Sequence, residues 1–441
     1  MDLRHRTAAE LGRAIGAGEL DPVALTETYL DAIAAHPEAP RIYSHVTAER
    51  ARAEAAGAAL RAKAGRRLSP LDGVPISWKD LFDSAGAPTE AGTALLKGRI
   101  PEHDAAALTL ARQAGLVCLG KTHLSEIAFS GLGYNPITAT PPNVTDPEAV
   151  PGGSSSGAAA SVAFGIAAAA IGTDTGGSIR TPAGWNDLVG FKPTHGAVPM
   201  EGVVPLCASL DTGGPLCRSV EDAALILSTL TGQPAPDLEA STLAGTRLMV
   251  AEGFFLEDLD RDTEAAFEAA VQRLETAGAR IIRAPLEMLE PAYALTFQLY
   301  PPEAWAAWRD LIEANPDAMF REIYDRTSAG ASVTAPDYIA AQSALRGHRD
   351  SYARATAGFD AVLCPTTPTR PPKLEAIASS SEAYRTANLS ALRNTRLANL
   401  LGLCSVTLPT GVPACGVMLN AAAGADRRLL RLAKAAETAL A

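Results

Sequence analysis

The chain has 441 residues, of which 47% are hydrophobic and 20% charged, so it has enough apolar material for a large core. Its 38 basic and 49 acidic residues give a formal net charge of −11, which argues against a nucleic-acid-binding protein. The longest apolar stretch, residues 157–172, is rich in alanine and shorter than the ~20 residues of a membrane-spanning helix, which argues against a membrane protein.

The cysteines and histidines do not form the patterns of disulfide or metal sites. The six cysteines contain no CxxC pair, and most have apolar neighbours, as Cys118 and Cys404 do. This pattern predicts buried free thiols in a reducing compartment. The seven histidines form no HxH or HExxH motif, so we expect no metal and no cofactor. No apolar run follows the charged N-terminus, so the predicted location is cytoplasmic, without a signal peptide.

The first 65 residues have the spacing of helices. Pro22 suits the first turn of a helix, and Leu25, Tyr29 and Ile33 then recur on one face. A second, alanine-rich helix is predicted from about Thr47 to Lys63. Residues 1–65 are therefore expected to form a helical segment packed on the rest of the chain.

Beyond residue 65, short apolar runs alternate with helical patterns. A buried strand is predicted at 73–80, a helix at 105–114, a strand at 116–119, a helix at 158–165 and an apolar run at 167–171. Further on, the patterns predict a strand at 247–251, a helix capped by Asp262 or Thr263, and a strand at 280–282. This alternation predicts an α/β fold, with helices on both faces of a sheet.

Two short motifs match well-known sites in the wrong context. Residues 115–122 match the phosphate-binding GxxxxGK[ST] pattern, but a helix is predicted before Gly115 and an apolar strand between the two glycines. Residues 153–157 match the GxSxG nucleophile elbow, but a proline-rich loop precedes them instead of a strand. Neither His195 nor His348 has a pattern that marks a catalytic base, so an ordinary serine hydrolase is not expected.

Two glycine-flanked serines, Ser154 and Ser178, lie 24 residues apart, separated by a predicted helix and strand. The consecutive glycines Gly176 and Gly177 allow a turn whose amides converge on one point, as an oxyanion hole requires. Ser178 would lie at the edge of that turn, where an attacking oxygen belongs. Either serine alone is better interpreted as part of a glycine-serine turn that leads into a helix.

A nucleophilic serine needs a base, and lysine can act as one if burial lowers its pKa from ~10.4. Lys79 ends a strongly apolar strand and is the candidate. The alternative is that Lys79 pairs with Asp80 or Asp83 at the strand end, and the local sequence favours neither interpretation over the other.

The segments 152–155 and 172–180 together resemble the amidase signature family closely. Blocks that are similar to further family segments follow the same order along the chain, at 73–80, 120–122, 190–194, 363–368 and 399–403. The resemblance implies one amidase domain over 1–441, built on a single large mixed sheet covered by helices on both faces. Residues 232–336 would be its variable, substrate-side region.

The resemblance also implies a Ser–cis-Ser–Lys triad. In it Ser178 is the nucleophile, Ser154 is a bridging serine on a cis peptide bond, and neutral Lys79 is the base. The backbone amides that would hold the oxyanion are those of Thr175, Gly176, Gly177 and Ser178. Substrate contacts are expected from Ala128, Ser130 and Tyr134. The aromatic residues Tyr300, Trp305 and Trp308 are candidates for an apolar site, or equally for the core.

The segment Gly184-Trp185-Asn186-Asp187 departs from the family pattern. It follows the nucleophile segment, so it is expected to reshape the pocket floor, and the substrate cannot be inferred from the family. The leading hypothesis is hydrolysis of the C–N bond of a small carboxamide through an acyl-serine intermediate. The alternative is the glutaminase (A) subunit of an aminoacyl-tRNA amidotransferase, which passes ammonia to a partner, although the compact segment 409–416 disfavours a large docking surface.

A third, non-enzymatic hypothesis is an anion-binding protein that uses the glycine-rich turn. The expected partner is a small-molecule amide, with neither nucleic acid nor membrane, and a homodimer is the default oligomeric state.

Overall fold

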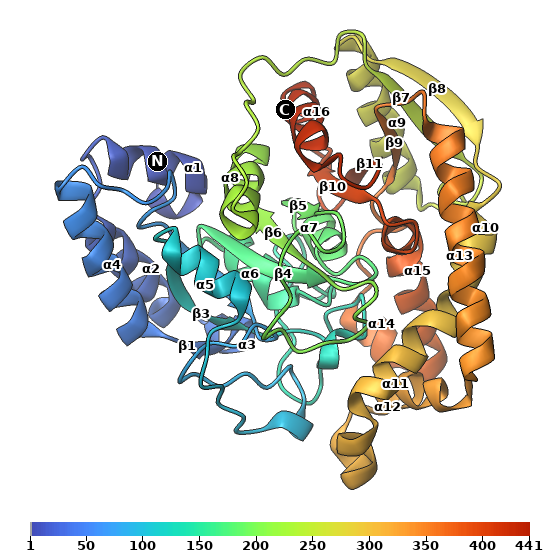
Figure 1. Ribbon diagram of the computed structural model, residues 1–441, viewed down its shortest axis with the longest axis horizontal. Coiled ribbons are helices and arrows are strands. Elements are labelled where there is room, and N and C mark those ends of the chain that lie inside the picture. The colour runs from blue at the N-terminus through green and yellow to red at the C-terminus, as the bar shows by residue number, and fades with distance from the viewer. Residues whose placement is uncertain (1) are drawn as a thin grey trace.

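The computed structural model describes residues 2–441, and through them runs one mixed sheet of eleven strands (Figure 1). From one edge to the other its strands are β1 (Tyr43–Val46), β3 (Val117–Thr122), β2 (Pro75–Lys79), β4 (Ala169–Asp174), β6 (Thr212–Cys217), β5 (Val189–Lys192), β10 (Cys404–Pro409), β11 (Gly416–Ala421), β9 (Ala361–Pro365), β7 (Arg247–Glu252) and β8 (Arg280–Pro285). Strand β2 is parallel to β3 and β4, and β7 is parallel to β8 and β9, whereas the other neighbours are antiparallel.

Alternate residues of a strand enter separate cores, because successive side chains of a strand point to opposite faces. In β7, Leu248 and Val250 belong to one hydrophobic cluster, and Met249 and Ala251 belong to another. The first cluster is covered by α5 (Ala106–Gln113), α8 (Val220–Thr231), α9 (Arg261–Thr276) and α16 (Asp426–Leu440). The second is covered by α10 (Leu289–Ala294), α11 (Thr296–Ala314), α12 (Arg321–Ser328), α13 (Ala335–Thr356) and α15 (Ser381–Leu400). The expected α/β architecture, with helices on both faces, is confirmed.

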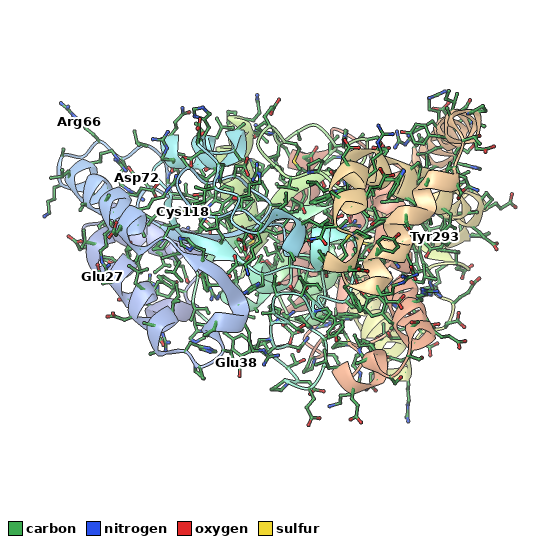
Figure 2. All side chains as sticks on the ribbon, turned by 90° about the horizontal axis from the view of Figure 1, so that it is seen from below. Glu27, Glu38, Arg66, Asp72, Cys118 and Tyr293 are labelled. Atoms are coloured by element: carbon green, nitrogen blue, oxygen red, sulfur yellow. The ribbon has the colours of Figure 1, made fainter. Side chains whose placement is uncertain are left out.

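The N-terminal helices extend the first core at one end of the molecule. They are α1 (Ala8–Gly16), α2 (Pro22–Ala35), α3 (Ala39–Ile42) and α4 (Ala48–Lys63). Figure 2 shows Glu27 and Glu38 at this end and Tyr293, among the helices that follow β8, at the other. The remaining helices are short: α6 (Ser156–Ala163) and α7 (Arg180–Trp185) lie against the sheet, and α14 (Leu374–Ala378) packs on α15.

Most predicted elements are present, with shifted ends. Strand β3 runs to Thr122, three residues beyond the predicted end, because the Lys121 side chain is buried and its Nζ donates to Asp80 Oδ1 at 2.9 Å. Helix α9 starts earlier than predicted, because Asp260 is its N-cap and accepts from the amide of Thr263. The context of the GxxxxGK[ST] match is as expected, since α5 precedes Gly115 and β3 begins at Val117.

The cysteines match the prediction of buried free thiols. All six cysteines lie within residues 2–441, where they are buried and form no disulfide. None of the helices described for these residues combines the length and the apolar character needed to cross a lipid bilayer.

Candidate active site

Lys79 lies at the end of β2 with its side chain fully buried. Its Nζ donates to Ser154 Oγ at 2.6 Å and to Thr173 Oγ1 at 2.7 Å. Lys79 therefore contacts one hydroxyl in the loop before α6 and one on strand β4. The alternative prediction, a pair with Asp80 or Asp83, is wrong. Asp80 pairs with Lys121, and Asp83 pairs with Arg99.

The surroundings of Lys79 favour its neutral form. Burial lowers the pKa of Lys79 from 10.5 to about 7, and the negative charges of Asp174 and Asp211 oppose that shift only in part. Neither carboxylate forms an ion pair with Lys79 among residues 2–441, which is why desolvation outweighs attraction. A lysine with such a pKa can accept a proton near neutral pH.

Ser154 and Ser178 are brought together by backbone contacts. The Gly153–Ser154 peptide bond is cis, as the family resemblance implies. The amide of the next residue, Ser155, donates to the carbonyl of Ser178 at 3.1 Å, so the two serine segments lie side by side. Within residues 2–441 the two hydroxyls form no hydrogen bond with each other, and Ser178 Oγ has no protein partner.

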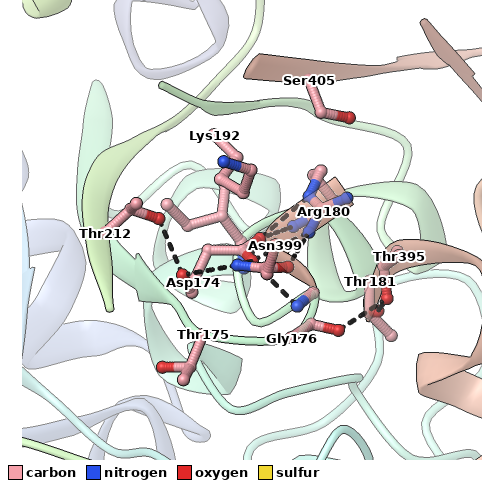
Figure 3. A network of polar contacts seen from close by, with 12 residues as sticks. Asp174, Thr175, Gly176, Arg180, Thr181, Lys192, Thr212, Thr395, Asn399 and Ser405 are labelled. Atoms are coloured by element: carbon pink, nitrogen blue, oxygen red, sulfur yellow. Dashed lines mark hydrogen bonds and ion pairs between the residues drawn. The ribbon is translucent and has the colours of Figure 1, made fainter. Parts of the chain in front are cut away.

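Asp174 organises the loop between β4 and α7 (Figure 3). Its carboxylate accepts from the amides of Gly177 (2.8 Å) and Ile179 (3.1 Å), and from Nε (3.0 Å) and Nη2 (2.9 Å) of Arg180. Asn399 donates to the same carboxylate at 2.9 Å. Although burial opposes the charge, Arg180 brings the pKa of Asp174 down to about 2. The loop is therefore held by a fully buried ion pair.

Two side chains from other helices donate hydrogen bonds to carbonyls of this loop. Thr395 Oγ1 donates to the carbonyl of Gly176 at 2.9 Å, and Tyr300 Oη donates to the carbonyl of Thr175 at 2.9 Å. Gly177 has φ +131°, and a Cβ there would lie 2.0 Å from Thr395 Oγ1, so only glycine fits.

One of the four amides expected to form an oxyanion hole already has a hydrogen-bond partner in the structure. Because the Gly177 amide donates to Asp174, it is already occupied. The amides of Thr175, Gly176 and Ser178 make no hydrogen bond within the described part of the chain. Three of the four predicted donors are thus without a protein partner in the described residues, and the fourth shapes the turn.

A pocket that is partly open to solvent adjoins this loop, and its empty space, open solvent included, amounts to about 520 Å³. Thr175, Gly176 and Ser178 form one wall. The predicted contacts Ala128 and Ser130 line it, as does Tyr300. Tyr134 does not: its ring packs against those of Phe320 and Tyr384, with centroids 5.6 and 6.3 Å away, so it belongs to a neighbouring core.

For the two tryptophans the structure supports the core alternative, whereas the expectation for the segment 184–187 is wrong. Trp308 is buried and donates to the carbonyl of Pro205 at 3.0 Å, outside this pocket, and Trp305 packs on the core. The segment 184–187 does not line the pocket floor. Instead, Trp185 donates to Thr367 Oγ1 at 3.0 Å, and Asn186 donates to the carbonyl of Pro151 at 2.7 Å. The Asn186 contact holds the segment that leads to Ser154.

Sequence reasoning missed two arginines in the pocket wall, Arg326 on α12 and Arg396 on α15. Neither stands in a recognisable motif. No group of three or more His, Cys, Asp or Glu side chains in the described residues could hold a metal ion.

Comparison with known proteins identifies relatives over nearly the whole chain. A family model described as Amidase matches residues 24–430. The 2-amino-5-chloromuconic acid deaminase of Comamonas testosteroni is 38% identical, over 98% of this chain and 96% of that protein. The glutamyl-tRNA(Gln) amidotransferase (A) subunit of Acidothermus cellulolyticus is 33% identical, over 99% and 95%. A crystal structure of an amidase superposes with a TM-score of 0.91 and 33% identity, over 99% of this chain and 100% of that one.

Proposed function

Because this chain belongs to the amidase family, and is thus a hydrolase of carbon–nitrogen bonds, we propose that it cleaves a small carboxamide through an acyl-serine intermediate on Ser178. The observation that carries this proposal is the 2.6 Å contact between the buried Lys79 Nζ and Ser154 Oγ, next to the segment of Ser178, whose hydroxyl has no protein partner among residues 2–441. A lysine with a pKa of about 7 and a serine without a protein partner are the base and nucleophile that amide cleavage needs.

In the first half of the proposed reaction, neutral Lys79 takes the proton of Ser154, and Ser154 takes the proton of Ser178. The Ser178 oxygen attacks the amide carbon, and a C–O bond forms. The proton returns from Lys79 through Ser154 to the amide nitrogen, the C–N bond breaks, and ammonia or an amine leaves.

In the second half, water attacks the ester carbon while its proton passes to the same relay. The bond to Ser178 breaks, the proton returns to the serine oxygen, and a carboxylic acid is released. Both tetrahedral intermediates carry negative charge on oxygen. The amides of Gly176 and Ser178, together with that of Thr175, are the proposed donors to that oxygen.

A second candidate is the glutaminase subunit of an amidotransferase. The 33% identity to a glutamyl-tRNA(Gln) amidotransferase (A) subunit over 99% of this chain favours it. This function requires a partner subunit that receives the ammonia. It predicts that pull-down from the native organism recovers a stoichiometric partner, and that transfer of ammonia to an acceptor occurs only in the complex.

The proposed function is tested by labelling with a fluorophosphonate and weighing the intact protein. The wild type should gain one adduct, Ser178→Ala should gain none, and Lys79→Ala should react at least about 100-fold more slowly. Ser156→Ala is the matched control, because among residues 2–441 the hydroxyl of this neighbouring serine makes a single long contact, 3.5 Å to the carbonyl of His123. An unlabelled wild type, or a labelled Ser178→Ala, would reject the proposal.

The rate of labelling should rise between pH 5.5 and 8.5 with an apparent pKa of about 7, because only neutral Lys79 accepts a proton. Glu126, near the pocket, is the matched control, since burial raises its pKa to about 7 as well. The rise should persist in Glu126→Gln. A rate that does not change between pH 6 and 8.5, or a rise that disappears in Glu126→Gln, would contradict the assignment to Lys79.

A further inference from the structure

The pocket beside Ser178 contains two guanidinium groups without an acidic partner. Arg326 and Arg396 both line it, and neither forms an ion pair with Asp or Glu anywhere in residues 2–441. Two other buried cations of this protein do have an acidic partner: Arg180 is paired with Asp174, and Lys121 with Asp80. A charge that is shielded from water without an acidic partner is costly, so a buried guanidinium (Arg396) and a half-buried one (Arg326) in the same pocket require an explanation.

Arg326 is held in the pocket wall by the loop that bears Ala128. Its Nη1 donates to the carbonyl of Phe129 at 2.7 Å, and its guanidinium lies over the Phe129 ring, 5.2 Å from the centroid. Burial lowers the pKa of Arg326 to about 10, so it still carries its charge at neutral pH. These contacts orient the guanidinium but do not neutralise it.

Arg396 lies against the loop of the proposed oxyanion donors. A Cβ at Gly176 would be 3.5 Å from Arg396 Nε, so the side chain touches that loop. Its Nη1 donates to Tyr293 Oη at 3.0 Å, and its guanidinium lies over the rings of Tyr293 and Tyr300, 5.4 and 5.7 Å from the centroids. Arg396 is only 5% exposed, so its charge faces the pocket and not bulk water.

We propose that the substrate carries a carboxylate, which Arg326 and Arg396 bind while its amide lies at Ser178. This inference rests on the proposed function and adds the chemical class of the substrate. A carboxylate would supply the missing negative charge and accept from the planar guanidinium donors. The two arginines are then residues that determine specificity.

The lining also indicates what the substrate lacks. None of the described residues that line the pocket is an aspartate or glutamate. An ammonium group would therefore find two positive charges and no negative one. The pocket fits the monoamide of a dicarboxylic acid, and disfavours a zwitterionic amino-acid amide such as glutamine.

The test compares matched substrates with the wild-type protein. Kinetics are measured on the monoamides succinamate and glutaramate, and on butanamide and pentanamide, in which a methyl group replaces the carboxylate. At least one monoamide should have a kcat/KM about 100-fold above its matched neutral amide. L-Glutamine, which adds only an ammonium group to glutaramate, should be at least about tenfold poorer than glutaramate.

Variants assign the preference to the two arginines. Arg326→Met and Arg396→Met should each lower the ratio of monoamide to neutral-amide kcat/KM by about tenfold or more. Arg385→Met removes a guanidinium from the same helix as Arg396, but one that is exposed and paired with Glu322, so the ratio should be retained. Protection of Ser178 from the fluorophosphonate by glutarate, but not by neutral glutaramide, is a second readout that needs no turnover.

The outcomes separate this inference from the proposed function. If Ser178 is labelled but neutral amides react as fast as monoamides, or glutarate fails to protect, the carboxylate assignment is overturned while the acyl-serine proposal stands. A preference for L-glutamine over glutaramate also overturns it. If Ser178 is neither labelled nor active, both proposals fall together.

Discussion

Replacing Lys79 with methionine is expected to lower kcat/KM for amide hydrolysis by about 10⁴-fold, because it removes the proposed base of the serine relay. Methionine fills a similar volume without a charge, so the buried end of β2 should keep its packing. Steady-state kinetics on the best substrate measure the loss. A variant that keeps more than about 1% of the wild-type rate would show that Lys79 is not the base.

The same substitution should change how stability depends on pH. The pKa of Lys79 is about 7 in the folded protein and 10.5 as a free side chain. The folded state therefore binds fewer protons than the unfolded state between these values, and the wild type gains stability as pH rises from 7 toward 10.5. Relative to Lys79→Met, the gain should be about 1.4 kcal/mol per pH unit.

Urea unfolding of both proteins at pH 7, 8, 9 and 10 measures this difference. Taking the difference between the two proteins cancels the titration of other groups, such as Lys192, whose pKa burial lowers to about 8. A difference that stays constant over this range would mean that Lys79 is charged in the folded protein at neutral pH, which also contradicts its role as a base.

Replacing Arg180 with methionine is expected to destabilise the protein by about 3–5 kcal/mol, because it leaves the carboxylate of Asp174 buried and unpaired. The loop that carries Ser178 depends on this carboxylate, so activity should fall with stability. Arg180 lowers the pKa of Asp174 to about 2, so the pair contributes fully above about pH 4 and is lost as pH falls toward 2.

A double-mutant cycle with Asp174→Asn separates the pair from its surroundings. The double variant should lose less free energy of unfolding than the two single variants together, since it leaves no unpaired charge. Arg52→Met, which breaks an exposed pair with Glu27, is the matched control and should leave the denaturant midpoint unchanged. Additive losses in the cycle would show that the two side chains act independently.

The sequence predicted the neighbourhood of the three candidate catalytic residues better than it predicted the pocket. Lys79, Ser154 and Ser178 lie in short motifs with glycines and apolar strands, so local patterns and a family resemblance locate them. The contact of Lys79 with Thr173, and the occupation of the Gly177 amide by Asp174, depend on how β4 and its loop fold. The spacing of residues along the chain does not specify which of the four neighbouring amides donates to the carboxylate of Asp174.

The pocket depends on packing between distant segments. Arg326 and Arg396 lie on separate helices, and each is placed by contacts with other helices or loops, such as those to Phe129 and Tyr293. Nothing local distinguishes them from surface arginines. Tyr134 shows the opposite error, because its neighbourhood suggested the pocket, whereas its ring packs in a core with Phe320 and Tyr384.

The order of the strands has a consequence for synthesis on the ribosome. Strands β10 and β11 follow every other strand along the chain, yet they pair between β5 and β9 near the middle of the sheet. Until they emerge, the nascent sheet is two separate pieces, each with an unpaired edge that can join another chain. Asn399 and Arg396, which brace the Ser178 loop and its pocket, are synthesised just before them. A stalled chain that ends before residue 404 thus holds Lys79, Ser154 and Ser178 but lacks the strands that join its two halves, so we expect it to be inactive and to expose sheet edges.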